Sequence, residues 1–462
     1  RCDSGRPTCQ QCLRANTPAE CVYGQGAEQS SIQMLEDRIS RLQGRITFLE
    51  SNTTGPVLLH DPYAQSEGQP AGQVGPIVTE RRTLTPVMAQ NLIRTFSGSA
   101  TQVGFFMHVP RFLQRTLASS LPTAPRHART LMNAVYLLGA YFSSDPNLNN
   151  LQGELLAYTL QDLSTTLIDL TPLAIMDVLQ AEVLLTYYFF SNGRTVEGVY
   201  HMDAASAIVL ASKLHQIRSA RYSVIAGGTP SRYRPAPTMD PIEEGQRINA
   251  FWTTFILDRN WSVALGRTPV LTDEERKGTE IDTPWPRSVE TYEHSPLPEG
   301  LHGFRTVQSL LNDPVYSFTE QSPLAVHAKA AALYSAATRV AVQIGTMADP
   351  FPPGWLELDS RVTQFQQALP TVDRINPTRQ DLYSKVLLVS LLAYGATIEL
   401  HQPLEIQGSG IPLNSSTFTA AMSAFNVLDS VNIAGIRYVD PIVGVSIRFK
   451  HLLLVMLMYL TV

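Results

Sequence analysis

The chain has 462 residues, of which 44% are hydrophobic and 16% charged, enough for two or more folded units with a large core. Its formal net charge of −5 argues against nucleic-acid binding over the whole surface and leaves that role to a local module. No stretch reaches the ~18–20 apolar residues that span a bilayer. The nearest approach, residues 451–462, predicts a buried core helix rather than a membrane anchor.

All cysteines of the chain lie near its N-terminus, at Cys2, Cys9, Cys12 and Cys21. Cys9 and Cys12 have the spacing of a tight turn that presents two thiolates to one tetrahedral zinc ion. Small, loop-forming residues fill the gaps, as expected where a metal replaces a hydrophobic core. We therefore predict that these cysteines bind metal. Disulfides or free thiols are the alternative, and disulfides would need an oxidising compartment.

Over this segment the sequence resembles the fungal zinc-cluster transcription factors, whose six cysteines bind two zinc ions. The four cysteines match the last four of that pattern in order and spacing, and Asp3, Pro7 and Tyr23 also agree with it. The resemblance implies that residues 1–24 are a partial DNA-binding domain with zinc on its cysteines. Its DNA-contacting residues would be Arg1, Arg6 and Arg14.

The first cysteine pair of the family pattern would lie before Arg1, so the resemblance also implies an N-terminally truncated fragment. In the family, two of the six cysteines bridge the metals. One zinc would then keep Cys2 and Cys9, and the other would keep Cys9, Cys12 and Cys21. Neither set reaches four ligands, and the family's base-reading side chains would also be missing. We therefore expect this fragment to bind zinc and DNA poorly.

Residues 31–50 carry a heptad repeat. Isoleucine occupies every a position and leucine every d position, which favours a parallel two-stranded coiled coil. Because the repeat is short, dimerisation through it is expected to be modest or assisted. An amphipathic helix packed on the body is the alternative. The predicted dimerisation residues are Ile32, Leu35, Ile39, Leu42, Ile46 and Leu49.

Residues 51–84 are rich in Gly, Pro, Ser and Gln without periodicity, which predicts a disordered linker. From 85 to 462, apolar residues recur at helical spacing, and proline stands at predicted helix starts after Thr85, Asp145, Thr171 and Asp240. The predicted fold class is all-α: a small zinc-cluster module, a short parallel coiled coil and a large all-helical regulatory domain. Further helices are expected at 126–142, 195–214, 323–344, 359–369, 378–400 and 417–431, with Pro/Gly-rich connections at 225–240 and 284–300.

The segment from Arg247 to Pro269 resembles the signature of the fungal-specific regulatory domain, also called the middle homology region, with Thr268 inserted. Residues 193–214 and 283–286 resemble flanking parts of the same domain. Together with the cysteines, the resemblance covers nearly the whole chain. It implies that residues 85–462 form one domain that regulates transcription.

The same residues also have a purely physical interpretation. One apolar helical face is predicted to pack in the core, and it consists of Ile248, Phe251, Trp252, Phe255 and Ile256. The aromatic run from Tyr187 to Phe190 is predicted as core as well. An ion-pair network at the helix end is expected from Asp258, Arg259 and Arg267, with an effector-binding cluster as the alternative.

No catalytic motif stands out, such as G-x-S-x-G, H-E-x-x-H or a P-loop. We hypothesise a nuclear, zinc-dependent transcription factor, not an enzyme, that regulates RNA polymerase II transcription. The resemblance implies that it binds double-stranded DNA as a homodimer at CGG-like half-sites. Co-regulators or a small-molecule effector would act on its body, and no membrane is involved. The alternative is an α-helical small-molecule-binding protein or enzyme with a degenerate zinc module.

Overall fold

The chain forms two compact units, Arg1–Arg81 and Arg82–Val462. We analysed them in a computed structural model. It describes residues 8–15, 40, 43, 84–118, 124–220, 232–274, 277–318, 322–344, 351–370, 380–407, 414–430 and 438–446. The predicted linker, except Leu84, and the apolar run at 451–462 lie outside these residues.

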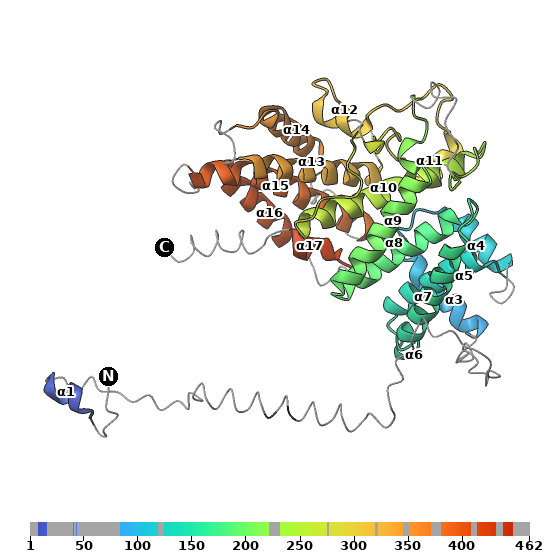
Figure 1. Cartoon of the computed structure of the whole chain (residues 1–462), viewed down its shortest axis with the longest axis horizontal. Helices are drawn as coiled ribbons and strands as arrows, with labels where there is room; N and C mark the ends of the chain where they lie inside the picture. The colour runs from blue at the N-terminus through green and yellow to red at the C-terminus, as the bar shows by residue number, and fades with distance from the viewer. Residues whose placement is uncertain are drawn as a thin grey trace, which may run out of the picture. The chain divides into compact units, whose positions relative to one another are not determined.

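The second unit is built from helices that pack on one another in a series (Figure 1). Among the described residues, the only β-structure is an isolated parallel bridge between Ser219 and Gly303. The all-helical fold predicted for the body is therefore confirmed for its described part. No described helix is long and apolar enough to cross a membrane.

The first helices form one end of this unit (Figure 1). Helix α5 contacts α3, α7 and α8, and so links this group to the centre. The elements are α3 (Pro86–Ser97), η2 (Ala100–Val103), α4 (Val109–Ala118), α5 (Arg126–Tyr141), α6 (Pro146–Asn149) and α7 (Gln152–Ile168).

The centre is formed by α8, α9 and α10, which pack in that order along the series. Short helices and loops follow α10 before the chain reaches the other end of the unit. The elements are α8 (Ile175–Ser191), α9 (Thr195–Ala211), η3 (Leu214–Gln216), α10 (Pro241–Ala264), α11 (Val289–His294) and α12 (Thr306–Asn312).

The last helices pack onto α10 through α13 (Figure 1). Helix α13 presents a run of buried alanines between Ala325 and Ala337, and α15 packs closely on it. The elements are α13 (Pro323–Gln343), α14 (Trp355–Ala368), α15 (Gln380–Gln407), α16 (Ser416–Asp429) and α17 (Pro441–Ser446).

Capping residues fix where several helices begin. The side chains of Thr85, Asp145 and Asp240 accept N–H groups of the first turn, and proline follows each of them. These predicted starts are confirmed. The start predicted at Thr171 is wrong: residues 171–174 form a turn, and α8 begins at Ile175.

Two helices are longer than predicted, and one was not expected. Helix α14 starts at Trp355, after Gly354 with its positive φ of 81°, and not at residue 359. Helix α15 runs through Pro403 to Gln407, although its end was predicted at residue 400. His401, near the end of α15, binds Asp359 of α14 at 2.8 Å. The predicted connection 284–300 contains α11.

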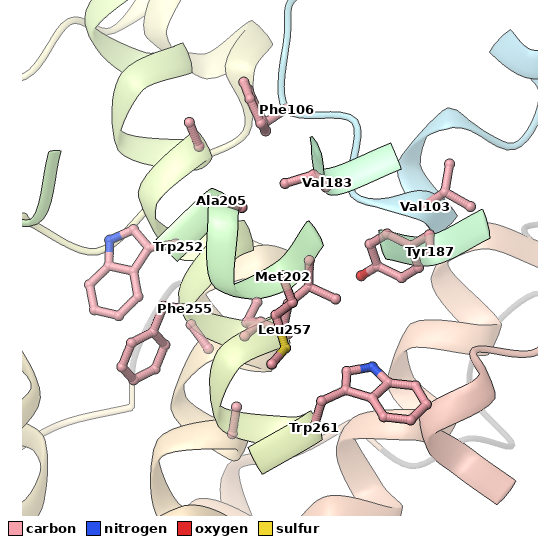
Figure 2. Close-up of a cluster of buried hydrophobic side chains, with 14 of the residues drawn as sticks. Val103, Phe106, Val183, Tyr187, Met202, Ala205, Trp252, Phe255, Leu257 and Trp261 are labelled. Carbon is pink, nitrogen blue, oxygen red and sulfur yellow. The ribbon is translucent and has the colours of Figure 1, made fainter. Parts of the chain in front are cut away.

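The core runs through α8 and α10. Figure 2 shows side chains of α8, α9 and α10 gathered there, among them Val183, Met202 and Trp252. The predicted apolar face of α10 is buried. All the remaining residues from Ile248 to Ser262 are buried as well. The prediction that this face packs in the core is confirmed, and the burial of the rest of the segment follows from contacts of α10 with α9, α13 and other elements. The aromatic run from Tyr187 to Phe190 is buried, as predicted.

Candidate functional site

Two of the predicted zinc ligands, Cys9 and Cys12, lie at the start of the short helix α1 (Gln10–Arg14). Cys9 is its N-cap in an extended conformation, and its Sγ accepts the N–H of Cys12 at 3.4 Å. The Cys9 side chain is buried and Cys12 is half-buried. An N–H donor and a helix N-terminus both stabilise a thiolate, the form of cysteine that binds zinc. The residues that are described therefore fit a metal-binding cysteine turn.

The rest of the predicted cluster cannot be placed. Cys2, Cys21, Arg1 and Arg6 lie outside the described residues, whereas Arg14 is exposed in the last turn of α1. Within the described ranges no three His, Cys, Asp or Glu side chains gather into a metal site. The complete ligand set and the DNA-contacting role of the arginines stay predictions.

The heptad segment is described only at two positions. Ser40 and Gln43 are helical and exposed, and both lie off the predicted a/d seam. The six seam residues, from Ile32 to Leu49, lie outside the described residues. The coiled coil stays a prediction.

The polar residues at the end of α10 bind the main chain and not each other. The Asp258 carboxylate accepts the N–H groups of Val270 and Leu271, each at 2.9 Å. The Arg259 guanidinium donates to the Leu271 carbonyl and lies 5.0 Å from the Phe255 ring centre. Burial raises the pKa of Asp258 and lowers that of Arg259 to about 10. Both side chains therefore hold the loop that follows α10 in place by hydrogen bonds to its main chain.

The predicted ion-pair network is thus only partly correct. Arg267 donates to Asp203 of α9 at 2.6 Å, and both side chains are about one-third exposed. Among the described residues, Asp258 and Arg259 form no ion pair. The contacts of Asp258, Arg259 and Arg267 connect α9, α10 and the loop between residues 266 and 271. Their role is therefore structural.

The segment around Gly193 is explained by packing. Gly193 has a φ of 69°, which favours glycine, and it ends the turn between α8 and α9. A Cβ at Gly198 would lie 2.5 Å from the Phe190 ring, so only glycine fits there. Arg194 pairs with Glu197 and covers the Phe189 ring at 4.5 Å. These residues set the contact of two helices and show no ligand site.

Lys329 of α13 was not singled out from the sequence, although it is only 3% exposed. Its Nζ lies 4.9 Å from the ring centres of Trp285 and Tyr316 and 5.8 Å from that of Phe318. No carboxylate among the described residues pairs with it, and burial lowers its pKa to about 7. In sequence it lies within an alanine-rich helix, which gives no signal of this aromatic surrounding.

The comparisons with known proteins identify the second unit. The model of the fungal-specific transcription factor domain matches residues 93–342. The chain belongs to this family. The match includes α10 and the motif around Asp258, and it leaves the cysteine segment and the heptad outside. No curated protein matches the chain, and no solved structure does. By its family, the protein is a fungal transcription regulator.

Proposed function

We propose that this regulator of the fungal-specific transcription factor family binds DNA through a zinc cluster at its N-terminus. Cys2, Cys9, Cys12 and Cys21 would supply four of the six thiolates that hold two zinc ions in a complete cluster. Bound zinc would supply the fixed loop geometry that a segment without a hydrophobic core lacks. The observation that carries the proposal is the Cys9–Cys12 turn, in which a buried thiol accepts an N–H at a helix start.

The protein would act as a homodimer in the nucleus. The heptad of residues 31–50 would pair two zinc-cluster heads and thereby set the spacing of CGG-like half-sites. The arginines Arg1, Arg6 and Arg14 would contribute phosphate contacts, which position a protein on DNA without reading its sequence. The helical body would then transmit regulatory signals and carry out no catalysis.

The test is a measurement of zinc content and DNA affinity on the protein expressed from its complete coding sequence. Fluorescence anisotropy would compare a duplex with paired CGG triplets and a scrambled duplex at two salt concentrations. We expect Cys9→Ser to lose zinc and to lower the affinity for the CGG duplex at least about 1,000-fold, the lower end of the range that separates specific from non-specific binding.

The matched control is Gln11→Ser, which changes an exposed residue of the same short helix. It should keep the metal and the affinity. If Cys9→Ser keeps its zinc and still prefers the CGG duplex, the cysteine cluster is not the DNA-binding module.

A further inference from the structure

Helix α9 carries apolar residues around its whole circumference. A helix of this kind is normally buried on all sides. One side of α9 meets this expectation, because Met202 and Ala205 lie in the core between α8 and α10 (Figure 2). The opposite side is exposed, although it is also mostly apolar. Within the described part of the chain, therefore, no element covers this side.

The exposed side is a continuous row of side chains, which we call the α9 stripe. Its members follow one another at intervals of three or four residues, so they share one face of the helix: Val196, Tyr200, Ala204, Ala207 and Ala211. Val196 is 83% exposed and Tyr200 65%. Ala207 and Ala211 are exposed as well, and Ala204 is half-buried. Single exposed apolar residues are ordinary, whereas a continuous row of them indicates an interaction surface.

The side chains of the stripe are large at its start and small at its end. Val196 and Tyr200 lie in the first two turns of α9, whereas Ala207 and Ala211 lie in the last two. In an antiparallel pair of α9 helices with Ala204 beside the twofold axis, Val196 lies level with Ala211 of the second copy. By the same count, Tyr200 lies level with its Ala207. Large side chains of each copy then pack over small ones of the other, which makes the stripe complementary to itself.

The charges beside the stripe allow two copies to meet. Asp203 lies at the edge of the stripe near the axis, and its carboxylate binds Arg267 at 2.6 Å. Glu197, on the flank of the helix, pairs with Arg194. Each copy therefore presents neutral ion pairs and not like charges, which would oppose association. A strongly acidic or basic partner would find no opposite charge on the stripe itself.

The size of the stripe limits the strength of such a contact. From Val196 to Ala211 it is about 22 Å long, at 1.5 Å per residue, and a helix is about 10 Å wide. It therefore buries roughly 200 Å² on each copy, whereas a stable interface needs about 800 Å² per partner. The stripe is thus suited to two copies that are already tethered, because a tether raises the effective concentration of the second copy.

We propose that the α9 stripe is a self-association surface, on which a second copy of this chain packs its own α9 in antiparallel orientation. The twofold axis passes beside Ala204. The contact pairs the two helical bodies of the homodimer. Its strength, but not its geometry, rests on the homodimer of the proposed function, and it involves neither zinc nor DNA.

The experiment is cross-linking of the full chain with a single cysteine introduced into α9. The protein is treated with a short bismaleimide at up to about 1 mM, the effective concentration that a short flexible tether supplies. Trypsin releases residues 195–213 as one peptide, which contains no native cysteine. Mass spectrometry of this peptide therefore detects links made by the introduced thiol alone.

Ala204→Cys should link to Ala204→Cys of the second copy, because both lie beside the axis. The matched control is Ala368→Cys, an exposed alanine of α14. We expect the α9 thiol to react with its copy at least about tenfold faster than the control, since docking holds the two thiols together. Equal rates would overturn the proposal.

Two further cysteines test the orientation of the pair. Val196→Cys and Ala211→Cys should link to each other when the two variants are mixed. Neither should link to itself, because an antiparallel pair keeps identical ends about 22 Å apart. Self-links of Val196→Cys at the rate of the mixed link would contradict the antiparallel arrangement.

A charge on the stripe should prevent the contact. In the Ala204→Cys chain, Tyr200→Glu should slow the link at least about tenfold, the scale of losing an aromatic anchor at an interface. Thr195→Glu is the control, because Thr195 is exposed on the same helix but lies off the stripe. It should leave the rate unchanged. Equal effects of the two glutamates would count against the stripe.

The failure of this inference can be told apart from the failure of the proposed homodimer. A chain that is dimeric by sedimentation but forms no α9 link refutes the stripe and leaves the homodimer standing. An α9 link at 1 mM in a chain that also carries Leu42→Glu supports the stripe, whether or not the heptad dimerises.

Discussion

Lys329 shows how this protein tolerates an ionisable residue in its core. The side chain is surrounded by Trp285, Tyr316 and Phe318, whose ring faces replace part of the lost hydration. Since no carboxylate among the described residues pairs with it, burial lowers its pKa to about 7. Near neutral pH the amine is therefore poised to lose its proton.

Lys329 makes the stability of the helical unit depend on pH. An unfolded lysine keeps its proton up to about pH 10, whereas folded Lys329 loses it above about pH 7. The unfolded state binds more protons in this interval, so the free energy of unfolding rises with pH. Denaturant titrations between pH 7 and 9 should show this rise. Lys329→Met should reduce the slope of the free energy of unfolding against pH, and it should raise that free energy most at pH 7. The exposed Lys277→Met serves as the control and should leave the slope unchanged.

Asp258 should be important for stability because its buried carboxylate accepts two main-chain N–H groups of the loop that follows α10. Asp258→Ala leaves Val270 and Leu271 without an acceptor and should cost about 3 kcal/mol, the scale of buried charged hydrogen bonds. Asp258→Asn keeps one oxygen and should cost less. Denaturant unfolding measures both, with the exposed Asp169→Ala as control. Equal stability of Asp258→Ala and the parent would show that the loop finds other acceptors.

The burial of a single residue could be predicted from the sequence only where it depends on neighbouring residues of the same helix. The apolar positions of α10 could be placed in the core because their spacing repeats along one helix. The surrounding of Lys329 could not be foreseen, because its three rings come from the loops before α13 and meet only in the folded chain. In the same way, Tyr187 was predicted as core, but it also lines a small cavity whose wall includes Asp440, a residue of the last described segment. The sequence could not show that these two residues line one cavity.

Among the helices, the starts predicted at Thr85, Asp145 and Asp240 are confirmed, whereas those predicted at Thr171 and at residue 359 are wrong. A cap followed by proline is a local signal, as at Thr85 and Asp240. The extent of α15 is decided instead by a tertiary contact, the pairing of His401 with Asp359. Short helices such as α11 carry too few residues to show a period. Helix α11 packs on α10, a contact that is not visible in its own sequence.

The predicted coiled coil can be tested at the level of one helix. Leu42→Glu places a charge in the a/d seam and should make a dimer monomeric at tens of micromolar, as measured by sedimentation equilibrium. Gln43→Glu adds the same charge at a neighbouring, exposed position and should leave the dimer intact. Two variants with the same oligomeric state would place dimerisation elsewhere in the chain.

For the whole molecule, the family match and the folding unit differ in extent. The match ends at residue 342, yet α13 buries its alanines against α15, which begins at Gln380. A fragment of residues 93–342 would expose this surface to water. We expect it to aggregate or to lack a cooperative unfolding transition, whereas residues 82–462 should unfold cooperatively. Calorimetry of both fragments decides this, and a sharp transition of the shorter one would contradict the expectation.

The stacked tryptophans of the second unit have a practical consequence for experiments. Trp252 lies against Trp285 and Trp261 against Phe190, and all four tryptophans of the chain belong to residues 82–462. All four cysteines belong to the first unit. Tryptophan fluorescence therefore reports only on the second unit, and a thiol-reactive dye reports only on the first unit. The two units can be followed separately, in one sample of the unaltered chain, while metal or DNA is added.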